Sequence, residues 1–312
     1  LLLAVDQLAI DLGPHRHLQQ AVINRAADTR IGGQFDALTR IDIANHSAVQ
    51  DQVIHSHVTF DGPLLAHGQG VGGAGQHQSG SGSRRPDLSK SAGGGGDVLL
   101  AFYHAANHVD AVELNPAMTA FVADTFSEFA GRIYDDPRVA THTAEARGFV
   151  AQNERHYDLI QIGLLDSFAA AGAGVHALNE SYLYTVEAFS EYLQHLQPGG
   201  ILSITRWTKT PPRDGLKIFA TAIEALRSSG VENPAERLLM IRGWKTSTLL
   251  IKNGRFKADE IARAKDFCRD RSFDLAYYPG IEPGETNRFN QLPEPYYYQG
   301  AKALLGGAAA DY

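Results

Sequence analysis

A run of four glycines followed by an aspartate, Gly93-Gly94-Gly95-Gly96-Asp97, constrains the fold of this chain more than any other feature. Glycines let the backbone adopt positive φ angles and approach a ligand closely. The apolar stretch 98–102 then predicts a helix whose N-terminal N–H groups face that ligand. Sixteen residues after Asp97, Glu113 ends the predicted strand 109–113, where a carboxylate can accept hydrogen bonds from both hydroxyls of a ribose. Loop and acid together predict a nucleoside-binding site in an α/β fold.

The order of the elements after Glu113 favours a doubly wound sheet. A helix is predicted over 116–129, a short strand near 138–140 and a buried strand over 157–162. Helices that alternate with short apolar strands are typical of a parallel sheet with ligands at the carboxyl ends of its strands. A glycine run alone is equally typical of a flexible linker, so the prediction depends on this order.

Composition excludes several classes of protein. The 312 residues are 44% hydrophobic, enough for one substantial core, and the formal charge of −7 argues against nucleic acid or an anionic membrane as a general partner. The single cysteine, Cys268, excludes an intramolecular disulfide and a multi-cysteine metal site, and we expect an ordinary half-buried thiol. No apolar run approaches the roughly 18 residues that span a bilayer. We expect a cytoplasmic chain without a metal.

The first 92 residues differ from the rest. They contain no glutamate, a single lysine and more than half of the histidines, and 62–82 is rich in Gly, Gln and Ser. This composition is typical of a linker or of disorder. The pairs His15/His17 and His55/His57 could each place two imidazoles on one face of a strand, but no third metal ligand stands at motif spacing.

The segment that joins this region to the glycine run is anomalous. A buried apolar strand should precede the loop, yet 85–92 is polar and carries Pro86. The first strand is therefore predicted to be missing or badly degraded. One hypothesis is that residues up to about 92 are read from a wrong frame, with the genuine frame beginning near Gly93.

From Gly93 to about Trp207 the chain resembles the spermidine synthase family, whose fold is that of the class I S-adenosylmethionine-dependent methyltransferases. The short motifs that carry the resemblance occur in the family's order and spacing: Gly94-Gly95-Gly96-Asp97, Val112-Glu113-Leu114-Asn115-Pro116, Asp136-Pro137-Arg138-Val139, Glu145-Ala146-Arg147-Gly148-Phe149, Tyr157-Asp158-Leu159-Ile160, Asp166, Tyr184-Thr185-Val186-Glu187-Ala188-Phe189 and Leu196-Gln197-Pro198-Gly199-Gly200-Ile201-Leu202.

The resemblance implies a binding site for S-adenosylmethionine or its decarboxylated form as co-substrate. Gly94, Gly95 and Gly96 match the family's glycine loop, and Asp97 matches the acid that contacts the amino end of the nucleoside's side chain. Glu113 matches the ribose ligand, and Glu145 with Ala146 matches the contacts to the adenine edge. A carboxylate only accepts hydrogen bonds, which suits hydroxyl and amine donors.

One departure from the family concerns catalysis. In aminopropyltransferases an Asp at the end of the strand that follows Tyr-Asp deprotonates the polyamine, and a second Asp three residues later binds it. Here the first position is Gly163 and only the second, Asp166, remains. Without a base the attacking ammonium keeps its proton near neutral pH. In the following segment, His176 and Tyr182 are the candidate proton-handling side chains.

The predicted fold class is α/β, a Rossmann-like class I methyltransferase sheet over 93–254. An irregular segment, 1–92, precedes the sheet and a small C-terminal α/β extension, 255–312, follows it. A helix over 216–229 and a hairpin of 238–241 with 246–251 complete the sheet's predicted elements. Bacterial relatives of this subtype are often fused to membrane-spanning segments, so the chain could be a cytosolic module of such a protein.

Three functions fit these features. The leading one is a spermidine synthase-like transferase that moves an aminopropyl or methyl group to an unidentified small-molecule acceptor, with a homodimer as the possible assembly. The second is a catalytically silent nucleoside-binding module, which Gly163 favours. The third, a nicotinamide-dependent oxidoreductase, is disfavoured because Val98 stands where the third fingerprint glycine should be.

Overall fold

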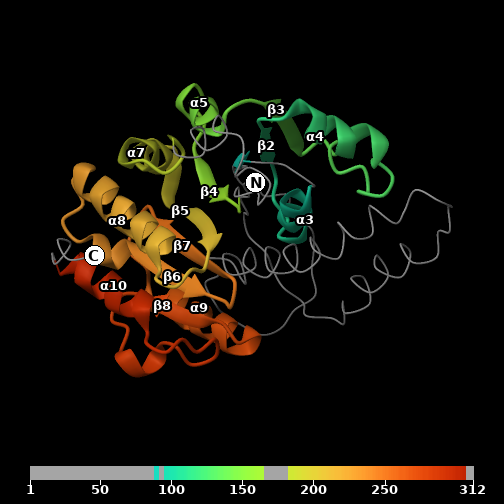
Figure 1. Cartoon of the computed structure of the whole chain (residues 1–312). Helices are drawn as coiled ribbons and strands as arrows, with labels where there is room; N and C mark the ends of the chain where they lie inside the picture. The colour runs from blue at the N-terminus through green and yellow to red at the C-terminus, as the bar shows by residue number, and fades with distance from the viewer. Residues whose placement is uncertain (1–87, 91–94, 165–181, 307–312) are drawn as a thin grey trace, which may run out of the picture.

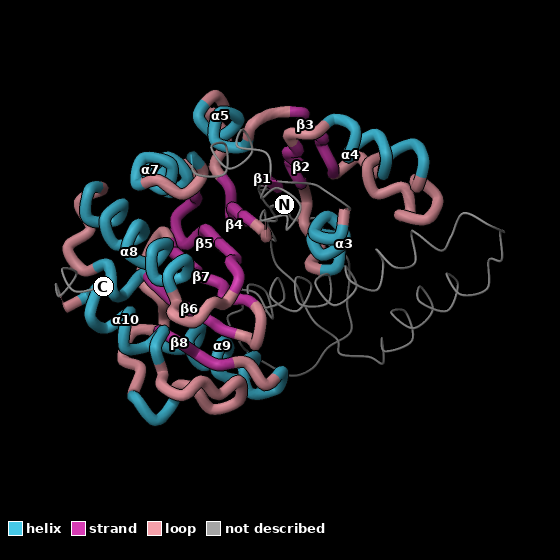
Figure 2. Tube along the Cα trace, in the orientation of Figure 1, coloured by secondary structure: helices cyan, strands magenta, loops and turns pink. Residues whose placement is uncertain are grey.

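The described part of the chain forms one eight-stranded sheet with helices on both sides (Figures 1 and 2). The computed structural model describes residues 88–90, 95–164 and 182–306. The strands run in the spatial order β3-β2-β1-β4-β5-β7-β6-β8. Their bounds are β1 Leu88–Lys90, β2 Val109–Glu113, β3 Val139–Thr143, β4 Tyr157–Ile162, β5 Leu196–Trp207, β6 Leu238–Arg242, β7 Thr246–Lys252 and β8 Asp274–Tyr277.

Strand direction divides the sheet into two parts. The neighbours from β3 to β5 all pair in parallel, whereas β7 pairs antiparallel with β5, β6 with β7, and β8 with β6. The order β3-β2-β1-β4-β5 is that of the doubly wound folds, with the switch point between β1 and β4. This confirms the predicted Rossmann-like class I methyltransferase sheet, and folds of this kind bind ligands at the carboxyl ends of these strands.

The helices cover the two faces unequally. On one side of the sheet lie α5, α7, α8 and α10, and on the other side lie α3, α4 and α9 (Figure 1). The helix bounds are α3 Gly96–Tyr103, α4 Pro116–Ala120, α5 Ala146–Ala151, α7 Val186–Gln194, α8 Arg213–Ser228, α9 Ala258–Arg271 and α10 Tyr296–Leu305, with a π-helical turn Phe121–Thr125 and short 3-10 turns Pro234–Arg237 and Pro283–Glu285.

Two helices begin with side chains that cap their free backbone N–H groups. The Asn115 side chain accepts from the backbone N–H of Ala117, and Pro116 fills the first helical position of α4, where no N–H is needed. Thr185 caps α7 in the same way, by accepting from the N–H of Ala188. The predicted helix over 116–129 is therefore correct in its start, but the α-helix ends at Ala120 and continues as a π-helical turn.

The first strand corrects the prediction for the N-terminal join. Residues Leu88–Lys90 form β1, parallel to β2 on one side and to β4 on the other. The strand was expected to be missing because its sequence is polar. Strand pairing, however, is made by backbone groups, and the apolar neighbours β2 and β4 offer hydrogen-bonding edges on both sides. The strand is short, but it is present, and it lies inside the segment expected to be irregular.

The C-terminal residues extend the same sheet. The sequence indicated a separate small unit after 254, but β8 pairs with β6 and lies between α9 and α10 (Figure 2). The buried side chains of Phe267 and Tyr277 belong to the same apolar cluster as those of β4 and β5. The predicted boundary at 254 is therefore no boundary of the sheet.

Candidate nucleoside-binding edge

Gly95 and Gly96 are the described residues of the glycine loop, and they lead into α3. Gly95 has φ of 77° and is the residue before the first helical turn, so the backbone takes a left-handed conformation that glycine adopts without strain. A Cβ built on Gly95 would lie 2.0 Å from Cδ1 of Ile133, a buried side chain. A Cβ on Gly96 would meet nothing within 4 Å. The close packing of the backbone against Ile133 thus requires glycine at position 95, whereas position 96 has room for a side chain.

Asp97 lies in the first turn of α3 and is buried, with 7% of its surface exposed. A carboxylate there is stabilised by the positive end of the helix dipole. The predicted helix over 98–102 is confirmed, and it brings Asp97 to the carboxyl end of β1. Gly94 lies outside the described residues.

Glu113 is the last residue of β2 and is 9% exposed. Its Oε1 accepts the backbone N–H of Asn115 at 3.0 Å. The carbonyl of Glu113 also accepts the N–H of Ala144 at 3.1 Å, and Glu113 stands in register with Thr143. Glu113, at the end of β2, and the segment after β3 are therefore joined by a hydrogen bond at one edge of the sheet.

Glu145 is the residue before α5. Its two carboxylate oxygens accept the N–H groups of Arg147, at 2.9 Å, and of Gly148, at 2.7 Å. The side chain is thus the N-terminal cap of α5, a role that the sequence analysis did not assign. A carboxylate has about four lone-pair sites, so capacity remains for a further donor. Ala146 follows as the first helical residue.

Tyr134 is a further residue of this edge, which the sequence analysis missed. Burial raises the pKa of its hydroxyl, and the negative charges of Glu113 and Asp97 raise it further. The phenol therefore stays protonated at neutral pH and lies close to both acids. The signal was weak, because Tyr134 lies two residues before the quoted motif that begins at Asp136 and is not part of it.

The predicted acceptor side is described only in part. Gly163 follows directly on Ile162 at the carboxyl end of β4 and is buried, so no side chain stands at that position. Asp166 and His176 lie outside the described residues. Tyr182 is 58% exposed, and its role as a proton-handling group stays a prediction.

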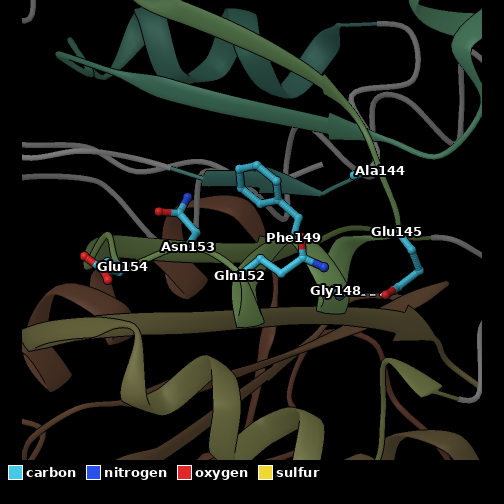
Figure 3. Close-up of a pocket in the computed structure, with 7 residues that line it drawn as sticks. All are labelled: Ala144, Glu145, Gly148, Phe149, Gln152, Asn153 and Glu154. Carbon is cyan, nitrogen blue, oxygen red and sulfur yellow. Dashed lines mark hydrogen bonds between the residues drawn. The ribbon is translucent and has the colours of Figure 1, made fainter.

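A cavity of about 630 Å³ opens along α5 (Figure 3). It is lined by Ala144, Glu145, Gly148, Phe149, Gln152, Asn153 and Glu154. Phe149 lines the cavity, and the centroid of its ring lies 4.5 Å from the centroid of the His142 ring. The cavity shares Glu145 with the candidate site but runs along α5 to Asn153 and Glu154, so it is an extension of the nucleoside edge rather than its centre.

Other candidates have structural roles. Cys268 is 3% exposed, more deeply buried than expected, and burial raises the pKa of its thiol, so it is no nucleophile at neutral pH. Trp207 is half-buried and Trp244 is 67% exposed. Among the residues that the structure describes, no group of three His, Cys, Asp or Glu side chains could hold a metal ion, and no helix is long and apolar enough to cross a membrane.

The strand order is that of a class I methyltransferase-like fold, and the acids at its carboxyl edge form the candidate nucleoside site. Residues 92–211, less than half of the chain, match the family model described as "Spermine/spermidine synthase domain". This part, which contains the acids and the glycine loop, is similar to that domain, in agreement with the resemblance given by the sequence motifs. No curated protein matches the chain.

Two spermidine synthases and a methyltransferase-like protein are among the solved structures that are similar to this chain. A spermidine synthase in complex with the transition state analogue AdoDATO is 17% identical, with a TM-score of 0.41. The match covers 71% of this chain and 66% of that one. Spermidine synthase from Thermotoga maritima is 16% identical, with a TM-score of 0.40 and coverages of 71% and 65%. Human methyltransferase-like protein 13 in complex with SAH is 18% identical, with a TM-score of 0.39 and coverages of 59% and 79%. The chain thus spans slightly less than two thirds of the two spermidine synthases.

Proposed function

We propose that this chain binds S-adenosylmethionine or its decarboxylated form at the carboxyl edge of β1, β2 and β3, and transfers a methyl or aminopropyl group from it to a small-molecule acceptor. One observation carries the proposal. Two buried carboxylates, Asp97 and Glu113, stand beside a glycine turn that admits no side chain at position 95. A carboxylate only accepts hydrogen bonds, and the ribose hydroxyls and amino group of such a nucleoside are donors, so this pair of acids suits it.

Each residue has a defined part in this proposal. Glu113 accepts the ribose hydroxyls, Asp97 accepts from the amino end of the donor's side chain, and Glu145 with the N–H of Ala146 meets the adenine edge. Tyr134 keeps its proton and donates within the acidic edge, which limits the repulsion between Asp97 and Glu113.

The reaction needs little from the protein beyond position. A lone pair of the acceptor attacks the carbon that is bonded to the sulfonium, the C–S bond breaks with its electron pair on sulfur, and the sulfur becomes a neutral thioether. The acceptor's proton passes to water or to a base outside the described residues. The reaction removes the positive charge of the sulfonium from an acidic, partly desolvated site. The site must accommodate this change in charge.

A second candidate is a catalytically silent nucleoside-binding module. The buried Gly163 favours it, because the position where aminopropyltransferases carry their base has no side chain. A cytoplasmic location and a homodimer stay predictions from the sequence.

Calorimetry with four ligands tests the proposal: S-adenosylmethionine, its decarboxylated form, methylthioadenosine and NAD. We expect the sulfur-containing nucleosides to bind and NAD to fail, since the loop lacks the third glycine of the dinucleotide fingerprint. Binding of NAD alone would overturn the proposal. Binding of the nucleosides without transfer to any amine, thiol or hydroxyl acceptor would favour the silent module.

A further inference from the structure

The helix after β2 is left uncovered by the described part of the chain. No residue of α4 is buried, and only Val122 is buried in the π-helical turn that continues it. The helix lies at the end of the sheet that β3 forms, away from β8 and α10 (Figure 1). A helix with apolar residues normally buries one face against another element. An apolar helix that buries none is a candidate interaction surface.

Exposed apolar side chains follow one another along this segment. Met118 and Phe121 stand three residues apart on the helix, so they lie on the same side of it. The ring centroid of Phe121 lies 4.5 Å from that of the half-buried Phe126, which lies 6.5 Å from that of Phe129. Phe129 is 71% exposed, and Leu114, just before the helix, is also exposed. We call these five side chains the α4 face.

The area of the α4 face matches what a stable dimer needs. Since an aromatic side chain offers roughly 150–250 Å² and an aliphatic one somewhat less, the exposed parts of this face amount to on the order of 400 Å². A standard interface buries about 800 Å² on each partner, of which a little over half is non-polar. The face therefore supplies nearly all of the apolar area of such an interface.

The charge of the segment favours a second copy of this chain as the occupant. Over 114–132 the charged residues are Asp124, Glu128 and Arg132, and Glu128 pairs with Arg132. Two copies of a chain with a net charge of −7 repel each other over much of their surface. Contact through the α4 face brings few like charges together, whereas a strongly charged partner would find little complementary charge there.

The two ends of the α4 face differ in chemistry. Leu114 and Met118 form an aliphatic end, and Phe126 and Phe129 form an aromatic end. A two-fold axis perpendicular to the face runs the two copies antiparallel, so that the aromatic end of each copy meets the aliphatic end of the other. A thioether sulfur packs favourably against an aromatic ring, so these ends complement each other.

We propose that the α4 face is the interface of a symmetric homodimer, in which Phe129 of one copy packs on Met118 of the second copy. The interface uses surface outside the proposed donor site, although Leu114 directly follows Glu113. The inference therefore does not depend on which ligand the chain binds.

Sedimentation velocity of the full chain, over a range of concentrations, tests this. We expect a particle of twice the 33.8 kDa of one chain, with a dimer Kd at or below about 1 μM, the weak end for interfaces of this size. Phe129→Glu should raise that Kd at least about tenfold, because the symmetric contact loses the ring twice. Circular dichroism should show an unchanged fold, since Phe129 packs mainly at the surface of the single chain.

Two further variants make the test specific. Trp244→Glu is the matched control, because Trp244 is an exposed aromatic residue of the turn between β6 and β7, and it should dimerise as the native chain does. Met118→Lys should weaken the dimer as Phe129→Glu does. An equal mixture of these two variants should dimerise more tightly than either alone, because the antiparallel contact then pairs an ammonium with a carboxylate.

Several outcomes would overturn the inference. One is a chain that stays monomeric at concentrations about a hundredfold above the expected Kd, whatever else covers the α4 face. Another is a dimer whose Kd is the same in Phe129→Glu, or is raised equally in Trp244→Glu. A mixture of Met118→Lys and Phe129→Glu that dimerises no better than its components would overturn the contact between Phe129 and Met118.

Discussion

At the scale of single residues, two acids on the same strand illustrate how surroundings decide a role. Asp110, near the start of β2, is fully buried and is bonded by His142 Nε2 at 2.8 Å, Arg155 Nη1 at 2.8 Å and the Tyr157 hydroxyl at 3.2 Å. Glu113, at the end of β2, faces the ligand edge. Asp110 therefore has a structural role, whereas Glu113 is the proposed ribose ligand.

Asp110→Asn is expected to lower the free energy of unfolding by about 1–3 kcal/mol at pH 7, since it removes the charge that these donors meet. Burial raises the pKa of Asp110, but hydrogen bonds from His108 and His142 and the charge of Arg155 lower it more, to a net decrease. Because the folded pKa lies below the unfolded one, the carboxylate stabilises the fold above about pH 4 and loses this effect as pH falls further.

Denaturant unfolding at pH 7 and pH 3 measures this difference. The gap between the native chain and Asp110→Asn should shrink at the lower pH. Asp136→Asn is a matched control, because Asp136 pairs with the half-exposed Arg138, and it should cost under about 1 kcal/mol. An equal cost of Asp110→Asn at both pH values would contradict the assignment.

The glycine turn gives a second prediction at the residue scale. Gly95→Val should abolish nucleoside binding and leave the rest of the sheet folded, because the side chain would meet Ile133 and β-branching disfavours positive φ. Gly96→Ala is the control and should bind normally, since the added methyl meets no atom. Calorimetry with methylthioadenosine and circular dichroism check both variants, and normal binding by Gly95→Val would show that the turn does not approach the ligand.

At the scale of elements, periodicity and turn chemistry predicted most of the sheet. β4 has the predicted bounds, α8 contains nearly all of the predicted helix over 216–229, and the hairpin of β6 and β7 is present. These segments carry their own signals, in apolar spacing or in alternation. β1 could not be predicted, because its polar sequence carries no such signal and its pairing comes from β2 and β4.

The candidate site was predictable where a strand end carries an acid. Glu113 and Glu145 stand at the edge that the element order implied. The capping role of Glu145 and the proximity of Tyr134 to two acids depend on three-dimensional packing, which spacing along the chain does not report. The same holds for β8, whose pairing with β6 joins residues far apart in the sequence.

A buried ion pair joins α9 to the sheet. Lys252 of β7 bonds Glu260 of α9, and both side chains are about 5% exposed or less. Glu260→Gln should lower the free energy of unfolding by about 3–5 kcal/mol, because it leaves a buried ammonium without its countercharge. The double change Lys252→Met with Glu260→Leu should recover most of that loss.

Chemical denaturation measures this prediction. Asp266→Asn is the control on the same helix, since the pair of Asp266 with Arg269 is exposed and should contribute under about 1 kcal/mol. If Glu260→Gln costs no more than Asp266→Asn, the pair does not anchor α9.

At the scale of the whole molecule, the proposed donor site lies at the carboxyl ends of β1 to β3, and Gly163 follows β4 at the position where the resemblance to aminopropyltransferases places a base. We expect little or no aminopropyl transfer to putrescine. An amine of pKa near 10 is almost wholly protonated at pH 7, so the reactive fraction is reduced about a thousandfold without a base.

Gly163→Asp tests this expectation with decarboxylated S-adenosylmethionine and putrescine. It should raise kcat from background, because the added carboxylate can accept the proton of the attacking ammonium. Strong activity in the unmodified chain would sink the argument. It would mean that another group, such as His176 or Tyr182, supplies the base.

The central claim, an adenosine-type nucleoside held at the ends of β1 to β3, is tested most directly by the affinity of methylthioadenosine for Glu113→Ala. The account predicts that binding weakens by about 1.5–3 kcal/mol, roughly tenfold to a hundredfold in Kd, because charge-assisted hydrogen bonds to the ribose are lost. Glu128→Ala, at an exposed acid that pairs only at the surface, should bind as the native chain does. An unchanged Kd for Glu113→Ala, or an equal loss for both variants, would contradict the account.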